Sequence, residues 1–219
     1  MNIIGLADIH GNLSQIDEIS DQLSKADLVL LIGDITNFGR ADDVKEVIEK
    51  VRKKASGIVA VSGNCDFPEV DDYLNSENLN FHGNSRIVDG ICFVGVGGSL
   101  VTPFKTPNEI SEDDFKSHLD EAMSGFPVEN PLILVSHQPP FQTSCDVLSS
   151  GDHVGSKSVR HFIEDYKPLA CFTGHIHESR SIDKIGMTYV INPGPLWQGH
   201  YAVAEINNGT IESADIVKI

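Results

Sequence analysis

The sequence of 219 residues lacks the marks of several protein classes. It contains no CxxC pair, and its cysteines, Cys65, Cys92, Cys145 and Cys171, have no regular spacing. This disfavours a disulfide framework or a zinc ribbon and fits reduced thiols inside a cell. The sequence also has no long apolar stretch and no basic segment at its start, so we expect neither a membrane span nor a signal peptide and predict a cytoplasmic protein.

Positive charge is scarce as well. The 16 Lys and Arg residues stand against 32 Asp and Glu residues, and the formal net charge is -16. Such a surface repels polyanions, and the sequence has no basic stripe interleaved with aromatic residues, so we expect no nonspecific binding of nucleic acid. We expect instead a small substrate that is captured locally.

No repeat, linker or low-complexity segment divides the sequence, and its length and 40% hydrophobic content predict one domain over residues 1–219. Apolar side chains recur with helical spacing around residues 13–23, 44–55, 111–122 and 159–166. Early in the chain such helices alternate with buried strands, which predicts βαβ units and a largely parallel sheet. From residue 181 onward the pattern has period two, and we expect an antiparallel meander there.

Five short runs rich in Val, Ile, Leu and Ala indicate buried strands, and each leads into a cluster that contains metal-binding side chains. Because the carboxyl ends of parallel strands meet at one edge of a sheet, these clusters are expected to converge. The clusters are Asp8-Ile9-His10, Gly33-Asp34, Gly63-Asn64-Cys65-Asp66, Ser136-His137 and Gly174-His175-Ile176-His177.

The spacing within the clusters favours a metal centre. Asp8 and His10 are separated by one residue, so both side chains can face the same ion, and His175 and His177 repeat this arrangement. Seven oxygen and nitrogen ligands are too many for one ion and suit two ions bridged by a carboxylate. The candidate ligands are Asp8, His10, Asp34, Asn64, His137, His175 and His177.

This ordered set resembles the calcineurin-like metallophosphoesterases, whose pattern is DxH, GD, GN[HC][DE], a lone His and GHxH. The variant with Cys in the third motif resembles a smaller, phosphodiesterase-like subgroup. The resemblance covers essentially the whole chain and implies an α/β metallo-dependent phosphatase fold, which is a four-layer sandwich of two central mixed β-sheets flanked by helices. It also implies one ion held by Asp8, His10, Asp34 and His177, and a second held by Asp34, Asn64, His137 and His175, with Asp34 as the bridge.

The function expected from this resemblance is a dimetal-dependent phosphoesterase that hydrolyses phosphodiesters, with monoesters as a further substrate class. The positive charge of two divalent ions would be partly neutralised by Asp8, Asp34 and a bridging hydroxide, and the remaining local charge of about +1 could capture a phosphate. The hydroxide would then attack phosphorus in line. Manganese is the first expectation, with iron, zinc, nickel or cobalt as alternatives. The alternative functions are a non-catalytic protein-interaction scaffold of the same fold and a nuclease, and the oligomeric state is left open.

Position 65 departs from the commoner family pattern, in which a His contacts the phosphate and protonates the leaving oxygen. Bound cations would lower the pKa of the Cys65 thiol and leave it no proton to give, so we hypothesise that His153 or water is the donor and that aryl oxides leave best. The alternative is that Cys65 is a small filler. Asn64 is expected in the catalytic site, and Asp66 is expected to orient its loop.

Two further expectations concern the segments around the site. His153 precedes the predicted start of a helix, whose free N–H groups could meet a substrate anion, although an ordinary cap is the alternative. The turn at 192–195 is expected to pack the loops behind the site. His82, His118 and His161 have no partner pattern and are expected to be solvated or core histidines.

Overall fold

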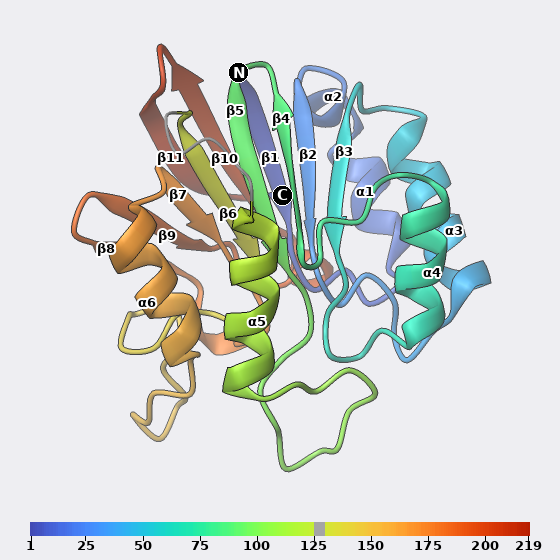
Figure 1. Cartoon of the computed structure of the whole chain (residues 1–219). Coiled ribbons are helices and arrows are strands. Elements are labelled where there is room, and N and C mark those ends of the chain that lie inside the picture. The colour runs from blue at the N-terminus through green and yellow to red at the C-terminus, as the bar shows by residue number, and fades with distance from the viewer. Residues whose placement is uncertain (125–129) are drawn as a thin grey trace.

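Two mixed β-sheets packed face to face form the centre of the molecule (Figure 1) in a computed structural model that describes residues 1–124 and 130–219. The first sheet has the strand order β11-β10-β1-β2-β3, and the second has the order β4-β5-β6-β7-β9-β8. The strands of the first sheet are β1 (Asn2–Leu6), β2 (Leu28–Ile32), β3 (Ile58–Val61), β10 (His200–Asn207) and β11 (Thr210–Lys218). Those of the second are β4 (Asn84–Val88), β5 (Ile91–Val96), β6 (Leu132–Ser136), β7 (Ala170–Phe172), β8 (Ser181–Ile185) and β9 (Thr188–Asn192).

Alternation along the central strands divides the core into three layers. In β1, Ile4 and Leu6 face the helices of the first sheet, whereas Ile3 faces the second sheet. Aromatic side chains from the second sheet, including Phe93 and Phe172, fill the space between the sheets. Strands buried on both faces explain why these runs are almost wholly apolar.

Helices cover both outer faces. The helices α1 to α4 pack on the first sheet, and α5 and α6 pack on the second, so the four-layer sandwich implied by the family resemblance is confirmed. No helix among the described residues is long and apolar enough to cross a membrane. The helices are α1 (Leu13–Glu18), α2 (Ser20–Leu23), α3 (Ala41–Arg52), α4 (Pro68–Ser76), α5 (Glu112–Met123) and α6 (Lys157–Tyr166).

Two helical features differ from the sequence prediction. The helix expected over residues 13–23 is interrupted at Ile19, which has φ −101° and ψ 17° and separates α1 from α2. The helix α4 was not predicted, because it buries only Val70 and Leu74 and therefore shows little apolar periodicity. Its start is marked by Pro68 at the first helical position, where a missing N–H costs nothing.

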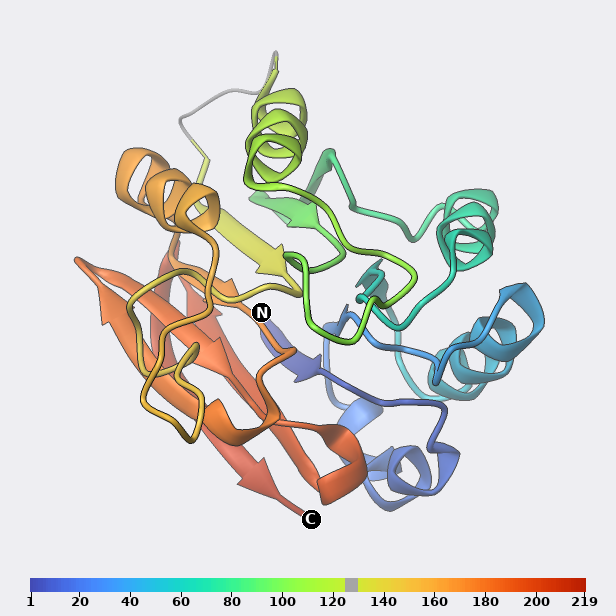
Figure 2. The same ribbon diagram turned by 90° about the horizontal axis from the view of Figure 1, so that it is seen from below.

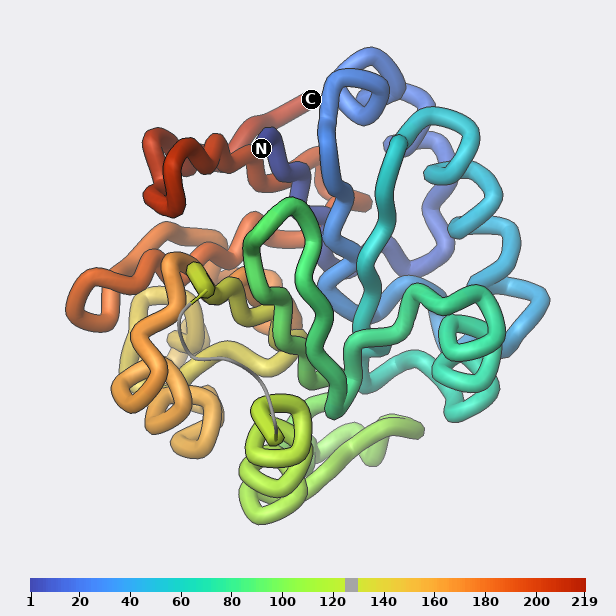
Figure 3. The backbone as a smooth tube through the Cα atoms, turned by 45° about the horizontal axis from the view of Figure 1, so that its top comes forward, coloured from blue at the N-terminus to red at the C-terminus, as the bar shows by residue number. Residues whose placement is uncertain are grey.

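The predicted C-terminal strands form two antiparallel hairpins, but they do not form one continuous meander. The hairpin β8–β9 joins the second sheet, where β9 pairs in parallel with β7, and the hairpin β10–β11 joins the first sheet, where β10 pairs antiparallel with β1. Figure 3 shows the red C-terminal hairpin beside the blue N-terminal strand. The chain changes sheets at 193–199, where Pro193 and Pro195 cannot donate ladder hydrogen bonds and the 3-10 turn η2 (Leu196–Gln198) follows.

The parallel strands bring the polar clusters to one edge. The pairings β1–β2, β2–β3, β5–β6 and β6–β7 are all parallel, and their carboxyl ends lie at the bottom of Figure 1. Figure 2 looks onto these ends from below and shows the loops that follow them. This edge is the place predicted for the metal site.

Candidate metal centre

The backbone turns sharply after the strands that carry the candidate ligands. Asp8, His10, Asp34 and His175 have φ values of 52°, 48°, 45° and 65°. Side chains other than glycine rarely adopt this left-handed conformation, and it persists only where the surrounding structure holds it in place. At these four positions the surrounding structure therefore holds the backbone in a strained conformation.

Three glycines let the ligand loops approach one another. A Cβ on Gly33 would lie 2.3 Å from Nδ1 of His137, and one on Gly63 would lie 2.1 Å from the backbone N of Asp34. A Cβ on Gly174 would lie 2.9 Å from Oδ2 of Asp8. These glycines are required by close packing between the loops, which explains why glycine precedes the ligand in three of the five clusters.

The seven predicted ligands do converge. Nε2 of His177 lies 3.2 Å from Oδ1 of Asp8, and the backbone N–H of His175 donates to the same carboxylate. The ring centroids of His137 and His175 are 5.2 Å apart, and Nε2 of His137 is 3.1 Å from Oδ1 of Asn64. Three groups of side chains offer ligand atoms within 4.8 Å of one another: Asp8 with His10 and His177, His10 with Asp34 and Cys65, and Asp8 with Asp34 and His137.

Asp34 lies between two histidines. Its Oδ1 is 3.5 Å from Nε2 of His137, and its Oδ2 is 3.7 Å from Nε2 of His10. The two oxygens of a single carboxylate thus face different imidazole rings. This is the arrangement that a bridging carboxylate needs.

The polar atoms at the centre need a further partner. Nδ1 of His137 lies 2.8 Å from the carbonyl oxygen of Ile32, which can only accept, so Nδ1 carries a hydrogen and Nε2 faces the oxygens of Asn64 and Asp34. Nε2 of His10 is buried and makes no hydrogen bond to any described residue. An unbonded buried nitrogen beside carboxylate oxygens fits a site for cations.

The protonation of two of the rings also suits metal binding. Burial lowers the pKa of His10 below its ordinary value, and burial together with the nearby His137 lowers the pKa of His175 to about 4. These two rings are therefore neutral near pH 7, and the neutral imidazole is the form that binds metals. For His177, the hydrogen bond and charge of Asp8 outweigh burial and raise the pKa.

Asp66 connects two ligand loops. Its buried carboxylate accepts hydrogen bonds from the N–H groups of Ile35, Thr36 and Gly63 and from Oγ1 of Thr36, at distances of 2.7 to 3.1 Å. Burial and the nearby Asp34 carboxylate raise the pKa of Asp66 to about 6. This geometry agrees with the expectation that Asp66 orients the Asn64 loop.

The loop after β5 holds Asn64 from the other side. Nδ2 of Asn64 donates to Oγ1 of Thr106 at 3.1 Å, and the N–H of Asn108 donates to the carbonyl of Asn64 at 3.1 Å. The amide of Asn64 is thereby oriented with Oδ1 toward His137. Sequence reasoning did not find these two contacts, because residues 102–108 follow no recognition pattern.

Cys65 is almost buried, with 8% of its surface exposed. Its N–H donates to Oδ1 of Asp34 at 2.7 Å, and its Sγ lies 3.5 Å from Nδ2 of Asn64. Burial and the Asp34 carboxylate raise the pKa of the thiol. The protein's own groups therefore favour the neutral thiol, and only bound cations would act in the opposite direction.

His153 lies outside the ligand groups. Its Nδ1 is 2.7 Å from Oδ1 of Asp146, a buried carboxylate that also accepts from the N–H groups of Thr143 and Gly155. The loop that carries His153 packs on the turn after the last histidine motif, because Ser149 donates to Glu178. The sequence did not predict the pairing with Asp146.

The start of α6 is an ordinary cap, which was one of the two expectations for this helix end, and its N–H groups are not free for a substrate anion. Ser156 accepts from the N–H of Val159, and the N–H groups of Lys157 and Ser158 donate to the carboxylate of Glu112 at 2.7 and 3.0 Å. A carboxylate of the protein already occupies this helix end.

The turn at 192–195 packs behind the site, as expected. Nδ2 of Asn192 donates to the carbonyl of Ile176 at 3.0 Å, between the last two histidine ligands in sequence, and the turn pairs with the end of β1 through Ala7 and Pro195. His82 and His118 contact each other away from the ligands.

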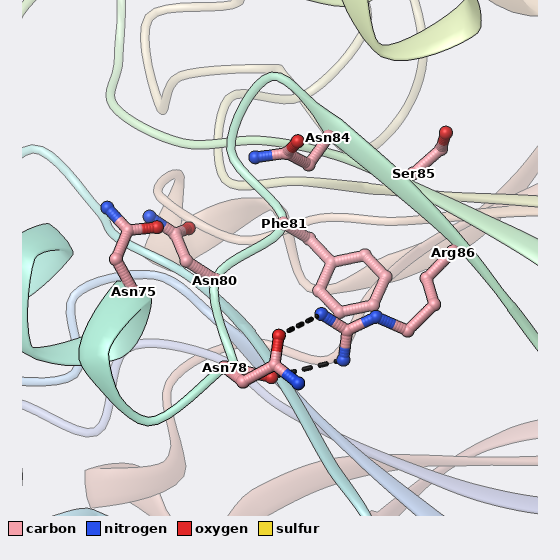
Figure 4. Close-up of a pocket in the computed structure, with 7 residues that line it drawn as sticks. All are labelled: Asn75, Asn78, Asn80, Phe81, Asn84, Ser85 and Arg86. Atoms are coloured by element: carbon pink, nitrogen blue, oxygen red, sulfur yellow. Dashed lines mark hydrogen bonds between the residues drawn. The ribbon is translucent and has the colours of Figure 1, made fainter. Parts of the chain in front are cut away.

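A separate cavity of about 170 Å³ lies between the end of α4 and the start of β4 (Figure 4). Arg86 spans it and donates to the backbone carbonyl and Oδ1 of Asn78 at 3.1 and 2.7 Å, above the ring of Phe81. None of the candidate ligands lines this cavity.

A family described as calcineurin-like phosphoesterases matches residues 1–179, which include every residue of the metal centre. The chain belongs to this family. The calcineurin-like phosphoesterase is 44% identical over 202 residues to the uncharacterized protein MJ1162 of Methanocaldococcus jannaschii, an alignment that covers 89% of this chain and 88% of the relative.

Solved structures share the fold of this phosphoesterase. The crystal structure of TT1561 of Thermus thermophilus superposes with a TM-score of 0.76 at 18% identity and covers 99% of this chain and 98% of the other. A structure described as a novel archaeal phosphodiesterase superposes with a TM-score of 0.53 at 15% identity over 100% of both chains. At these identities the likeness concerns the fold.

Proposed function

We propose that this calcineurin-like phosphoesterase hydrolyses phosphodiesters, with monoesters as a second substrate class, by means of two divalent metal ions. The observation that carries the proposal is the convergence of imidazole nitrogens and carboxylate oxygens around the buried, unbonded Nε2 of His10. The ligands would be Asp8, His10, Asp34 and His177 for one ion and Asp34, Asn64, His137 and His175 for the other.

Bound divalent ions would supply a water acidified for attack on phosphorus and positive charge for the phosphate oxygens. The protein's part is to hold and orient. Asp34 offers one oxygen toward His10 and the other toward His137, so it can bridge. Asp66 fixes the Asp34 and Asn64 loops relative to each other, and Thr106 fixes the amide of Asn64.

We propose manganese as the metal, with iron, zinc, nickel or cobalt as alternatives. Imidazole nitrogens combined with carboxylate and amide oxygens accommodate all of these ions. The net charge of -16 supports a small substrate over a polyanion. The buried, free cysteines support a cytoplasmic protein.

For the proton of the leaving group, we propose His153 or water as the donor. The hydrogen bond from His153 to Asp146 fixes Nδ1 and leaves Nε2 available for proton transfer. The same loop packs against the turn after His177. Asn64 and Cys65 complete the proposed catalytic group, and the near-buried Cys65 thiol lies beside the Asn64 amide.

The test is hydrolysis of bis(p-nitrophenyl) phosphate by protein loaded with Mn²⁺, before and after chelation, with p-nitrophenyl phosphate as the monoester. We expect turnover of the diester that is lost on chelation and restored by Mn²⁺. If none of Mn²⁺, Fe²⁺, Zn²⁺, Ni²⁺ and Co²⁺ supports turnover of either ester, the phosphoesterase proposal fails in favour of a non-catalytic scaffold.

A further inference from the structure

The sequence contains a single tryptophan, Trp197, and the structure places it against the metal centre. Its ring centroid lies 6.1 Å from that of His177, and the two rings are inclined by 74°. Trp197 is 42% exposed, although tryptophan is usually largely buried. A large aromatic surface is thus left open beside a proposed metal ligand.

The backbone around Trp197 is fixed to the strand end that carries Asp8. The N–H of Leu196 donates to the carbonyl of Ala7 at 2.9 Å, and the Leu196 side chain is fully buried. Gly199 ends the turn in a left-handed conformation with φ 80°. The indole is therefore presented by an anchored turn and not by a free loop end.

The loop after β5 carries more apolar surface on the other side of the strand ends. Val101 and Phe104 are 78% and 83% exposed, and their loop is bonded to Asn64 through Thr106. Figure 2 shows this green loop on one side of the end of β1 and the orange-red turn η2 on the other. Both segments are joined by hydrogen bonds to a ligand loop.

Of the other exposed apolar side chains, Phe38 lies in the loop after Asp34, whereas Met187 and Ile87 lie on elements that carry no candidate ligand. Met187 lies in the turn between β8 and β9, and Ile87 lies on β4. Isolated apolar residues of this kind are ordinary on protein surfaces. Met187 therefore provides a control for substitutions of Trp197.

We propose that Trp197 determines substrate specificity by stacking on a planar aromatic group of the phosphoester. This inference rests on the proposed function, in which the metal ions bind the phosphate that all substrates share. Selection among esters must then come from neighbouring surface. The flat face of an indole favours contact with a flat aromatic ring over contact with an alkyl group. Because the protein is acidic, we expect the part of the substrate beyond the phosphate to be uncharged.

The test is calorimetric titration of the Mn²⁺-loaded protein with three phosphonates that cannot be hydrolysed: phenyl-, cyclohexyl- and methylphosphonate. We expect phenylphosphonate to bind about ten-fold more tightly than either of the others, as one aromatic stacking contact allows. Trp197→Ala should abolish this preference, Trp197→Phe should keep part of it, and the control Met187→Ala should leave it unchanged.

The outcomes separate this inference from the function on which it rests. Equal binding of phenyl- and methylphosphonate, equal binding of phenyl- and cyclohexylphosphonate, or a phenyl preference that survives Trp197→Ala would each overturn the stacking role. Failure of all three phosphonates to bind would instead overturn the capture of phosphate by the metal centre, and this inference with it.

Discussion

Two groups of histidines in this phosphoesterase differ in what surrounds them. At the metal centre, rings lie beside Asp8 and Asp34, and one buried ring nitrogen has no hydrogen bond among the described residues. The rings of His82 and His118 lie even closer together, at 4.2 Å, yet Nδ1 of His82 accepts from the N–H of Gly97 at 2.9 Å. Among the described residues, no group of three metal-binding side chains includes this pair.

The difference shows that proximity of histidines does not by itself make a metal site. Carboxylates must supply negative charge, and ring nitrogens must be left without protein partners. The left-handed strand ends at Asp8 and Asp34 provide the first condition, because they turn both carboxylates toward the rings. For the second pair, Nδ1 of His82 already accepts from Gly97, and among the described residues no carboxylate lies close enough to complete a group of three potential ligands.

Removal of the Asp34 carboxylate should make the first group of histidines bind metal as poorly as the second. Asp34→Asn should lower manganese affinity and kcat/KM for a phosphodiester by about 1000-fold, because both proposed ions lose a charged ligand. Calorimetric titration with Mn²⁺ and the diester assay measure the two effects. Asp215→Asn, an exposed change of the same type on β11, should have no effect. Unchanged manganese binding by the Asp34 variant would contradict the assignment of the bridge.

A substitution of Asp66 tests whether the first group of histidines depends on the hydrogen bonds that hold the ligand loops. Asp66→Asn should lower the free energy of unfolding by about 3 kcal/mol, because an amide cannot accept all the hydrogen bonds of the buried carboxylate and places an N–H₂ group against backbone donors. Urea denaturation measures this loss. The exposed change Asp72→Asn is the control, and equal stability of the two variants would show that the Asp66 hydrogen bonds contribute nothing.

In the second group, His82 should affect how the free energy of unfolding depends on pH. Burial, and secondarily His118, lowers the pKa of His82 to about 4. Because the unfolded chain binds a proton near pH 6.5 and the folded chain does not, His82 lowers stability as the pH falls from about 6.5 to about 4. It should account for about 2 kcal/mol of the difference between pH 7 and pH 4.5.

The measurement for His82 is the free energy of unfolding at these two pH values for the wild type, His82→Gln and the exposed control His161→Gln. The His82 variant should lose less stability on acidification than the control. The same loss in both variants would mean that His82 stays accessible to protons in the folded protein.

The smallest expected effect on activity comes from a histidine introduced at position 65. Cys65→His should raise kcat/KM for an alkyl diester relative to an aryl diester by about five-fold, because it supplies an acid for the poorer leaving group. Cys65→Ser retains the size of the side chain and should leave this ratio unchanged. If the histidine variant also leaves it unchanged, position 65 has no part in protonation and Cys65 is a filler.

The convergence of the candidate ligands could be predicted from the sequence because each follows a buried strand, and parallel strands converge regardless of the distance along the chain. Asp8 and His177 are an example, with 3.2 Å between their side chains. The same local signals failed for the tail, because period two shows that a segment is a strand and does not show which sheet it joins. The sheet that each of β8 to β11 joins depends on packing between the sheets, and no local sequence pattern contains that information.

Supporting residues were harder to predict than ligands. Asp66 was found because it lies in the same motif as Asn64, whereas Asp146 and Thr106 belong to no motif, and Thr106 contacts a residue that is distant in sequence. Trp197 also follows no pattern, and only its contact with His177 gives it significance. Side chains that position others are recognised by their contacts, and such contacts appear only when the chain is folded.

The place of β1 between β2 and β10 has a consequence for the order in which the protein can mature. β1 leaves the ribosome long before its neighbour β10, which ends only at Asn207. Until then one edge of β1 is unpaired, and such long-range pairing is slow. Asp8 and His10 are therefore the first of the seven candidate ligands to be synthesised, yet the strand that precedes them is paired on both sides only after β10 has been made.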